Sequence, residues 1–346
     1  MTGRTRYFVI VSLLVLLVGV GTGLVAYYAG FPGAFASQGG VDDLRLLPAD
    51  TQFVAYADVR EVMSSELRQK IRTILPVTGE GQREIFEQTG INIETDIDQI
   101  IAAFAPPRGA ERMPGAPLVL AHGTFDTARI EGLMRQRGAQ VEEYKGIRLI
   151  VAAPLQTPPS SAQVPASVRS DNFAVAFIEP RLAALGGRSL IQAAIDQKSG
   201  GPGATGNTEL MSLVRSLDGG DVWAVGRFDT LASQARLPDG LAGQLPSITW
   251  FAANARVDSG IRGMLRADAR DEQAAGTLRD LVRGLIALAR LQAGSQPELK
   301  AALESLVLGG EGATVSVAFD VPGSTLDRLG AAVGGLHAGR RSLRSK

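Results

Sequence analysis

The feature that most constrains this chain is an uncharged, apolar run near its N-terminus, residues 7–28 (YFVIVSLLVLLVGVGTGLVAYY). At ~1.5 Å per residue, a helix of this length spans ~33 Å, which matches the hydrocarbon core of a bilayer. A helix in the core of a soluble protein keeps a polar face, and this run has none. The sequence therefore predicts one transmembrane helix over residues 7–29.

The charges on either side of this span predict its orientation. Arg4 and Arg6 precede it, and the next basic residue is Arg45. By the positive-inside rule, residues 1–6 form a cytoplasmic tail and the rest of the chain lies outside. We therefore expect a single-pass protein of the cytoplasmic (inner) membrane of a bacterium, with an extracytoplasmic bulk.

Two further points bear on this N-terminal segment. A signal peptide cleaved after Ala36 is the alternative to an anchor, but secretory apolar regions run ~7–15 residues and this one is longer. Gly19 and Gly23 are four residues apart within the span, a spacing that lets two membrane helices approach closely. The membrane is the first expected partner, and envelope proteins or a second copy, through Gly19 and Gly23, are further candidates.

Charge and composition exclude several functions. The first six residues carry two basic side chains and the last ten carry four; removing these six from 35 leaves 29 basic against 35 acidic residues, a net charge of −6. An acidic body argues against nucleic acid as a partner. The chain has no Cys and only two His, which excludes a disulfide framework, a thiolate metal site and a Cys nucleophile. We expect no metal and no cofactor.

Beyond the span, the sequence predicts an α+β fold with antiparallel sheets and helices packed on them. Small residues and Gly dominate residues 30–45, which we interpret as a linker. A Gly-rich run at 199–206 separates a first α+β half, 46–200, from a second, 207–336, and residues 337–346 form a basic, disordered tail. Expected strands lie at 53–58, 118–125, 141–146, 147–152, 173–178, 221–228, 248–257, 261–268 and 314–319. Expected helices lie at 58–75, 85–104, 127–137, 189–197, 272–292, 296–306 and 324–336.

A short string occurs twice. Gly-Thr-Phe-Asp-Thr at 123–127 returns as Gly-Arg-Phe-Asp-Thr at 226–230, each time at the end of an apolar strand. The recurrence favours two related halves, although chance similarity is an alternative for a string of five residues.

Candidate catalytic and metal-binding motifs are weak. His122 ends an expected strand and has Asp126 four residues on; we interpret it as a strand-end histidine with a local hydrogen bond. His337 lies in the basic tail. The run 201–208 has P-loop spacing, but Asn207 stands where the phosphate-binding Lys must be, and the run follows a helix. The acidic clusters are 42–43, Asp96 with Asp98, and Asp268 with Asp271 and Glu272. They lack a calcium-loop pattern, so we interpret them as helix caps or solvated surface.

Two short motifs suggest a family. Leu47-Pro48-Ala49-Asp50-Thr51, followed by Val54-Ala55-Tyr56-Ala57-Asp58, lies just beyond the predicted anchor, and Glu143-Tyr144-Lys145-Gly146-Ile147 forms an expected hairpin. With the strand–helix unit at 173–197, these motifs resemble an uncharacterised family of bacterial membrane-anchored extracytoplasmic proteins. The resemblance implies location and α+β architecture over about residues 46–320, and it implies no activity or site residue.

The sequence therefore predicts a non-enzymatic envelope protein that binds or scaffolds other components. No catalytic, cofactor-binding or metal-binding residue is assigned. The alternatives are an envelope hydrolase whose site assembles from distant residues, and a carrier of a lipid or other apolar ligand, for which the apolar stripe at 278–288 is a candidate.

Overall fold

The computed structural model describes residues 42–66, 86–87, 90–105, 117–152, 173–201, 203–217, 219–228, 247–293 and 297–325. The predicted cytoplasmic tail, transmembrane helix and basic tail, with Gly19, Gly23 and His337, lie outside these ranges. Within the described ranges, no helix combines the length and apolarity that crossing a bilayer requires.

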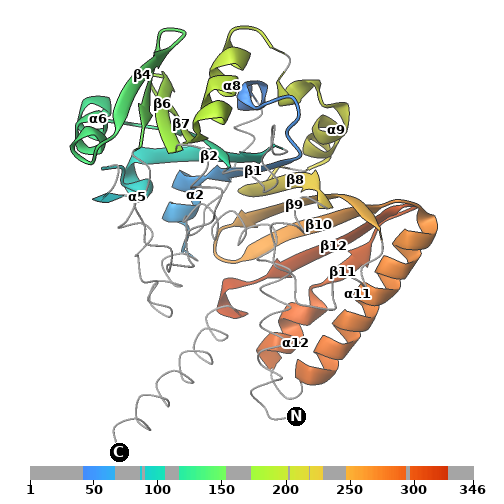
Figure 1. Ribbon diagram of the computed structural model, residues 1–346. Helices are drawn as coiled ribbons and strands as arrows, with labels where there is room; N and C mark the ends of the chain where they lie inside the picture. The colour runs from blue at the N-terminus through green and yellow to red at the C-terminus, as the bar shows by residue number, and fades with distance from the viewer. Residues whose placement is uncertain are drawn as a thin grey trace, which may run out of the picture.

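A single twelve-stranded sheet forms the frame of the protein (Figure 1). Its strand order is β11-β12-β10-β9-β8-β1-β2-β3-β7-β6-β5-β4, and every neighbouring pair is antiparallel. The strands are β1 (Phe53–Asp58), β2 (Ile97–Phe104), β3 (Leu118–Gly123), β4 (Gln140–Tyr144), β5 (Ile147–Val151), β6 (Phe173–Glu179), β7 (Leu182–Gly187), β8 (Val222–Arg227), β9 (Ile248–Val257), β10 (Ile261–Ala269), β11 (Val307–Gly309) and β12 (Thr314–Val321). The expected α+β class with antiparallel strands is confirmed.

Helices cover this sheet on two faces. The helical elements are η1 (Asp42–Leu46), α2 (Val59–Ser64), α5 (Ile93–Asp96), α6 (Thr127–Gln136), α8 (Arg188–Lys198), η2 (Ala204–Gly206), α9 (Thr208–Ser216), α11 (Glu272–Ala293) and α12 (Pro297–Glu304). One core joins η1, α8, η2 and α9 to one face of the sheet, over the strands that lie from β5 to β9 in the sheet order given above. Other cores join α2, α6, α11 and the residue Leu306, just after α12, to the opposite face. In Figure 1, α8 and α9 lie above the central strands and α2 lies below them.

The pleat explains how one strand serves both cores. In β3, Leu118 and Leu120 belong to the first core, while Val119 and Ala121 belong to the second. Successive side chains of a strand point to opposite faces, and a strand covered on both faces is apolar throughout. The central strands β1, β2, β3 and β8 are therefore almost continuously apolar.

The two predicted halves meet at the centre of the sheet, where β1 pairs with β8. Tyr56 lies opposite Trp223 in this pair, and their rings stack with centroids 5.5 Å apart. Both side chains are buried. The β1–β8 ladder and this aromatic stack therefore join the two halves predicted from the sequence into one sheet.

The strand order repeats outward from this junction. On one side the order begins β1-β2-β3-β7-β6, and on the other it is β8-β9-β10-β12-β11. By position, β8 corresponds to β1. The repeated string ends β3 and β8, which are not equivalent strands in this order. Aligning the two halves by the string therefore does not match their alignment by strand order.

Two expectations about elements and boundaries are wrong. The expected helix at 85–104 is a strand from Ile97 onward, because β2 is inserted between β1 and β3 and buried on both faces. The expected linker ends earlier than residue 45, because η1 begins at Asp42 and Leu44 is fully buried in the core. The Gly-rich run contains η2, and Ala204 donates its N–H to the carbonyl oxygen of Leu47 at 3.0 Å.

Candidate functional site

The structure brings His122 together with a residue that is distant in sequence. Nε2 of His122, near the end of β3, lies 2.7 Å from Oδ2 of Asp43 in η1. Both side chains are partly buried. The expected local partner, Asp126, instead accepts the backbone N–H of Arg129 and caps α6. Asp43, which we interpreted as solvated or capping, is thus the carboxylate that orients His122, and only the fold could reveal this.

The surroundings of His122 favour its charged form. The hydrogen bond to Asp43 raises the pKa of His122, partial burial opposes this, and the nearby charge of Glu179 raises it further. A carboxylate that orients an imidazole is one part of a general-base arrangement, which also needs a nucleophile within reach. The hydroxyl of Thr124, two residues on, accepts a hydrogen bond from Arg181 at 3.2 Å instead. The pair therefore fixes η1 to the sheet, and this geometry alone assigns no reaction.

A second charged cluster lies near the same ends of the strands. Asp98, at the start of β2, forms ion pairs with Arg60 and Arg181. The Arg181–Asp98 distance is 2.6 Å, and both arginines are well exposed while Asp98 is mostly covered. These contacts join α2, β2 and the β6–β7 turn.

The other acidic candidates have structural roles. Asp96 accepts the backbone N–H of Asn92 at 2.8 Å. Asp271 accepts the backbone N–H of Ala274 at 2.8 Å, at the start of α11. Asp268 accepts hydrogen bonds from Arg266 and Thr314. Among the described residues, no group of three His, Cys, Asp or Glu side chains could hold a metal ion.

Asn207 also has a structural role. Its side chain accepts the backbone N–H of Leu210 at 3.1 Å and caps the N-terminus of α9. The element that comes before the Gly-rich run is α8, which is a helix. The run therefore lacks the strand and the lysine that phosphate binding by a P-loop requires.

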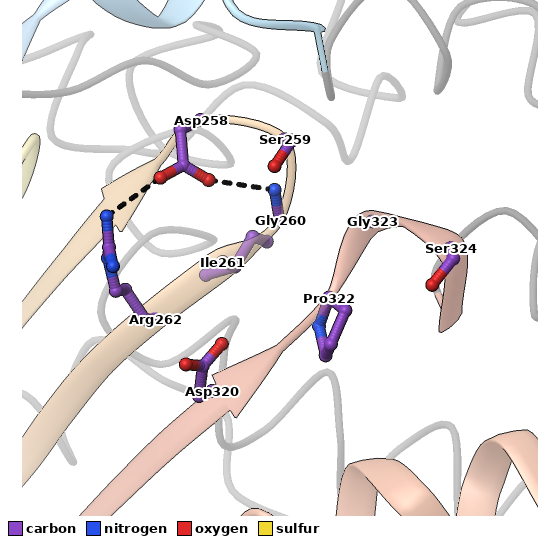
Figure 2. Close-up of a pocket in the computed structure, with 9 residues that line it drawn as sticks. All are labelled: Asp258, Ser259, Gly260, Ile261, Arg262, Asp320, Pro322, Gly323 and Ser324. Carbon is purple, nitrogen blue, oxygen red and sulfur yellow. Dashed lines mark hydrogen bonds and ion pairs between the residues drawn. The ribbon is translucent and has the colours of Figure 1, made fainter.

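A polar groove of about 350 Å³ opens where the β9–β10 turn meets the end of β12 (Figure 2). Backbones come very close here, because a Cβ on Gly323 would lie 1.7 Å from the carbonyl oxygen of Ser259. Figure 2 shows the side chains of Ser259, Asp320 and Ser324 bordering the opening. Only glycine at position 323 permits this contact between the turn and the strand end.

Asp258, which borders this groove, does not have the properties of a general acid. The backbone N–H of Gly260 and the charge of Arg262 hold the pKa of Asp258 below its usual range. A general acid at neutral pH needs a raised pKa. Asp258 is instead an anion that shapes the turn.

A larger surface is the face of β10 and β12 that points away from α11. It carries Arg262, Met264, Arg266 and Asp268 on β10, and Thr314, Ser316, Ala318 and Asp320 on β12, all partly or well exposed. The helix that follows β10, α11, packs on the opposite face. An antiparallel sheet with one solvated face alternates apolar and polar residues, and β12 does so. We call these eight residues the open sheet face.

The hairpin of the family resemblance is anchored to a helix. Lys145 and Gly146 have φ of 49° and 78°, as a two-residue type I′ turn requires. The Tyr144 hydroxyl donates to Asp196 in α8 at 3.0 Å, and Lys145 forms an ion pair with Asp196 at 2.7 Å. This network holds the β4–β5 edge of the sheet against α8.

Comparisons with known proteins give the chain no family. No family model matches the sequence, and no curated protein matches it. A solved structure described as "Structure of crystal form I of TP0453" is similar, with a TM-score of 0.45 and 11% identity, over 86% of this chain and 99% of that chain. A likeness at this level assigns no function.

Proposed function

We propose that this chain is a membrane-anchored extracytoplasmic protein that binds or scaffolds components of the bacterial cell envelope, without a catalytic role. The observation that carries the proposal is the uncharged run at 7–28, with Arg4 and Arg6 just before it and no basic residue after it until Arg45. A span of this length and flanking charge retains a chain in the bilayer with its bulk outside.

The start of the folded body supports a short tether. Thirteen residues, 29–41, separate the uncharged run from η1. A fully extended chain of that length reaches at most ~45 Å. Leu44, Leu46 and Leu47 are buried, and Asp43 is bound to His122, so η1 is firmly part of the core. The body is therefore confined close to the bilayer surface.

The open sheet face supports binding as the role. It offers side chains of both charges around a centre made by Met264, Ser316 and Ala318. Polar surfaces with a few apolar contacts are typical of non-obligate protein interfaces. We infer that an envelope protein contacts this face.

In-cell photocrosslinking of the full-length anchored chain tests this role. A photoreactive residue at position 318, on the open sheet face, should capture a defined envelope protein. The matched control is position 136, exposed on α6, which should not capture that protein. Equal capture at both positions, or capture at neither, contradicts binding through the open sheet face.

The repeated strand order supports a further proposal, that the two halves are copies of one five-stranded unit. In this proposal the β4–β5 hairpin is an addition to the first copy. We also retain the resemblance to the uncharacterised envelope family as a proposal. In its opening motif, the N–H and the hydroxyl of Thr51 both donate hydrogen bonds to the carbonyl oxygen of Pro48. An experimental structure whose two five-stranded units fail to superpose would contradict the duplication.

A further inference from the structure

We infer that residues 326–336 of this chain dock on the β11–β12 side of the open sheet face, in the place that α8 takes in the first half. The docked segment covers part of the surface that we assign to an envelope protein, so it regulates access to that surface. The inference rests on two parts of the proposed function, the duplication and the binding role of the open sheet face.

The two halves place equivalent helices on the same face of the sheet. The strands β3 and β10 have the same position in the two repeated strand orders. The helix α6 follows β3 and the helix α11 follows β10, and both pack on one face. A two-fold axis perpendicular to the sheet, between the antiparallel β1 and β8, relates such pairs and leaves each helix on its own face.

The same axis assigns a place to an equivalent of α8. This helix follows β7 and packs on β6 and β7, on the face opposite α6. By position, β12 corresponds to β7 and β11 to β6. The open sheet face lies on the α8 side, because its residue Arg266 is opposite Ala252, a member of the α8 core. None of the cores formed by the described residues joins a helix to this face of β11 and β12.

The strands in this place have side chains that suit a helix above them. Under α8, the strands β6 and β7 present small, fully buried side chains, which are Ala174, Ala176 and Ala184. In the equivalent place, Gly309 of β11 lies opposite Ser316 of β12, and Val307 lies opposite Ala318. Small side chains on a sheet leave room for the larger side chains of a helix. Val307 is 63% exposed, so an apolar side chain is available on this surface.

The chain that leaves β12 supplies the segment that docks. Helical backbone begins at Gly323, two residues after β12 ends. The sequence predicts that this helix continues to residue 336, and residues 326–336 lie outside the described ranges. Leu326, Leu329, Val333 and Leu336 recur at intervals of three and four residues, which places them in one apolar stripe of a helix.

This stripe matches the buried side of α8. Ile191 and Ala194, the fourth and seventh residues of α8, are fully buried against the sheet. Counted from Gly323, the fourth and seventh residues are Leu326 and Leu329. A helix that leaves β12 as α8 leaves β7 therefore turns its apolar stripe toward β11 and β12.

The docked segment is held in place by its connection to β12. Leu326 is five residues beyond Val321, the last residue of the strand. Such a short connection gives the segment a high effective concentration at the face. Its apolar contacts are few, and the rest of the open sheet face is polar, so a partner that makes more contacts can displace it.

The reaction rate of a single thiol on β11 tests the docking, and the chain has no cysteine of its own. In the purified full chain, the docked segment should protect Val307→Cys from a maleimide. Deleting residues 326–346 should raise the reaction rate of this thiol about tenfold, the effect of removing a weak apolar contact. Gln136→Cys, exposed on α6, is the matched control and should react equally fast with and without the deletion.

Two substitutions in the full-length chain tie the protection to the apolar stripe. Leu329→Asp places an unpaired charge in the proposed contact, so it should raise the reaction rate of Val307→Cys about tenfold. Ala331 is two residues further on, about 200° around a helix, and thus on the opposite side. Ala331→Asp should therefore leave the rate unchanged.

Two results would overturn the docking. One is an equal reaction rate of Val307→Cys in the full and the shortened chain. The other is an equal effect of Leu329→Asp and Ala331→Asp.

The regulatory role has a separate readout in cells. Deleting residues 326–346 should increase photocapture of the envelope protein from position 318, and unchanged capture would overturn regulation by this segment. The thiol measurement needs no partner, so failure of the proposed function is distinguishable. Protection at position 307 without any capture at position 318 would support the docked segment and contradict the proposed partner.

Discussion

At the residue scale, individual side chains and glycines lock segments that are far apart in sequence. The His122–Asp43 ion pair joins β3 to η1. Its strength depends on pH because Asp43 raises the pKa of His122. The ion pair is complete while His122 is protonated, below the ordinary histidine pKa of about 6.5, and it is lost as the pH rises through the higher pKa of the folded state.

Asp43→Asn should therefore destabilise the protein by about 1 kcal/mol at pH 5.5 and by less at pH 9, the scale of a partly exposed ion pair. Urea denaturation followed by tryptophan fluorescence measures this, and the neighbouring exposed Asp42→Asn is the control. A loss that is equal at both pH values for Asp43→Asn would mean that charge on His122 plays no part.

Replacing glycine by alanine should have opposite effects on stability at two positions. A Cβ on Gly123 would lie 2.0 Å from the carbonyl oxygen of Asp96, while a Cβ on Gly132 in α6 would meet no atom within 4 Å. Gly123→Ala should cost about 2 kcal/mol or more through backbone displacement, and Gly132→Ala should stabilise by about 0.5–1 kcal/mol. Chemical denaturation of the two variants should move the midpoint in opposite directions. A shift in the same direction for both would contradict the close approach at Gly123.

At the element scale, helix caps and turns follow local sequence. The side chain of Asp126 accepts the N–H of Arg129 and begins α6, and Asp58 does the same for α2 through Glu61. Asp126→Ala should destabilise the protein by about 1 kcal/mol and Asp126→Ser should restore most of that loss, because serine also caps. Thermal or urea unfolding provides the measurement, and equal losses for alanine and serine would rule out capping as the role of Asp126.

These local signals explain which elements the sequence predicted. The caps, the Lys145-Gly146 turn and the Asp258-Ser259-Gly260 turn act within a few residues, so their helices and hairpins were expected correctly. Strand β2 was not expected, because its residues can form a helix or a strand and their neighbours in the sheet decide between the two. Strands β7 and β11 and helix α9 were also missed. The runs of β7 and β11 are short or rich in Ala and Gly, which carry little periodic signal.

The candidate contacts were less predictable than the elements. His122 was singled out, but its partner Asp43 is 79 residues away, and spacing holds no information about such a pair. The groove at Gly260 and Gly323 likewise depends on two turns that meet only in the fold. Sequence reasoning located the caps because they are local, and it missed the long-range pairs because they are created by strand order.

At the scale of the whole molecule, β1 and β8 unite the two halves in one sheet. The aromatic stack of Tyr56 on Trp223 lies at this junction. Because the ladder crosses the junction without interruption, the two halves should unfold together rather than as separate domains. Trp223 and Trp250 both lie in the second half, and they report its unfolding by fluorescence.

A buried thiol in the first half tests this cooperativity. Ala184, in β7, is fully buried, so Ala184→Cys reports opening of the first half by its reaction with a thiol reagent. The midpoints of thiol exposure and of tryptophan fluorescence in urea should coincide. Midpoints that differ clearly, with the thiol exposed while fluorescence remains native, would show two independent units.

The proposed orientation of the chain in a membrane is directly measurable, because the sequence has no cysteine. A membrane-impermeant thiol reagent applied to intact cells should label full-length protein carrying Gln273→Cys, and should label Thr5→Cys only after the membrane is permeabilised. Labelling of the Gln273→Cys variant only after permeabilisation, or recovery of the chain in a freely soluble fraction, would contradict an anchored protein whose body faces away from the cytoplasm.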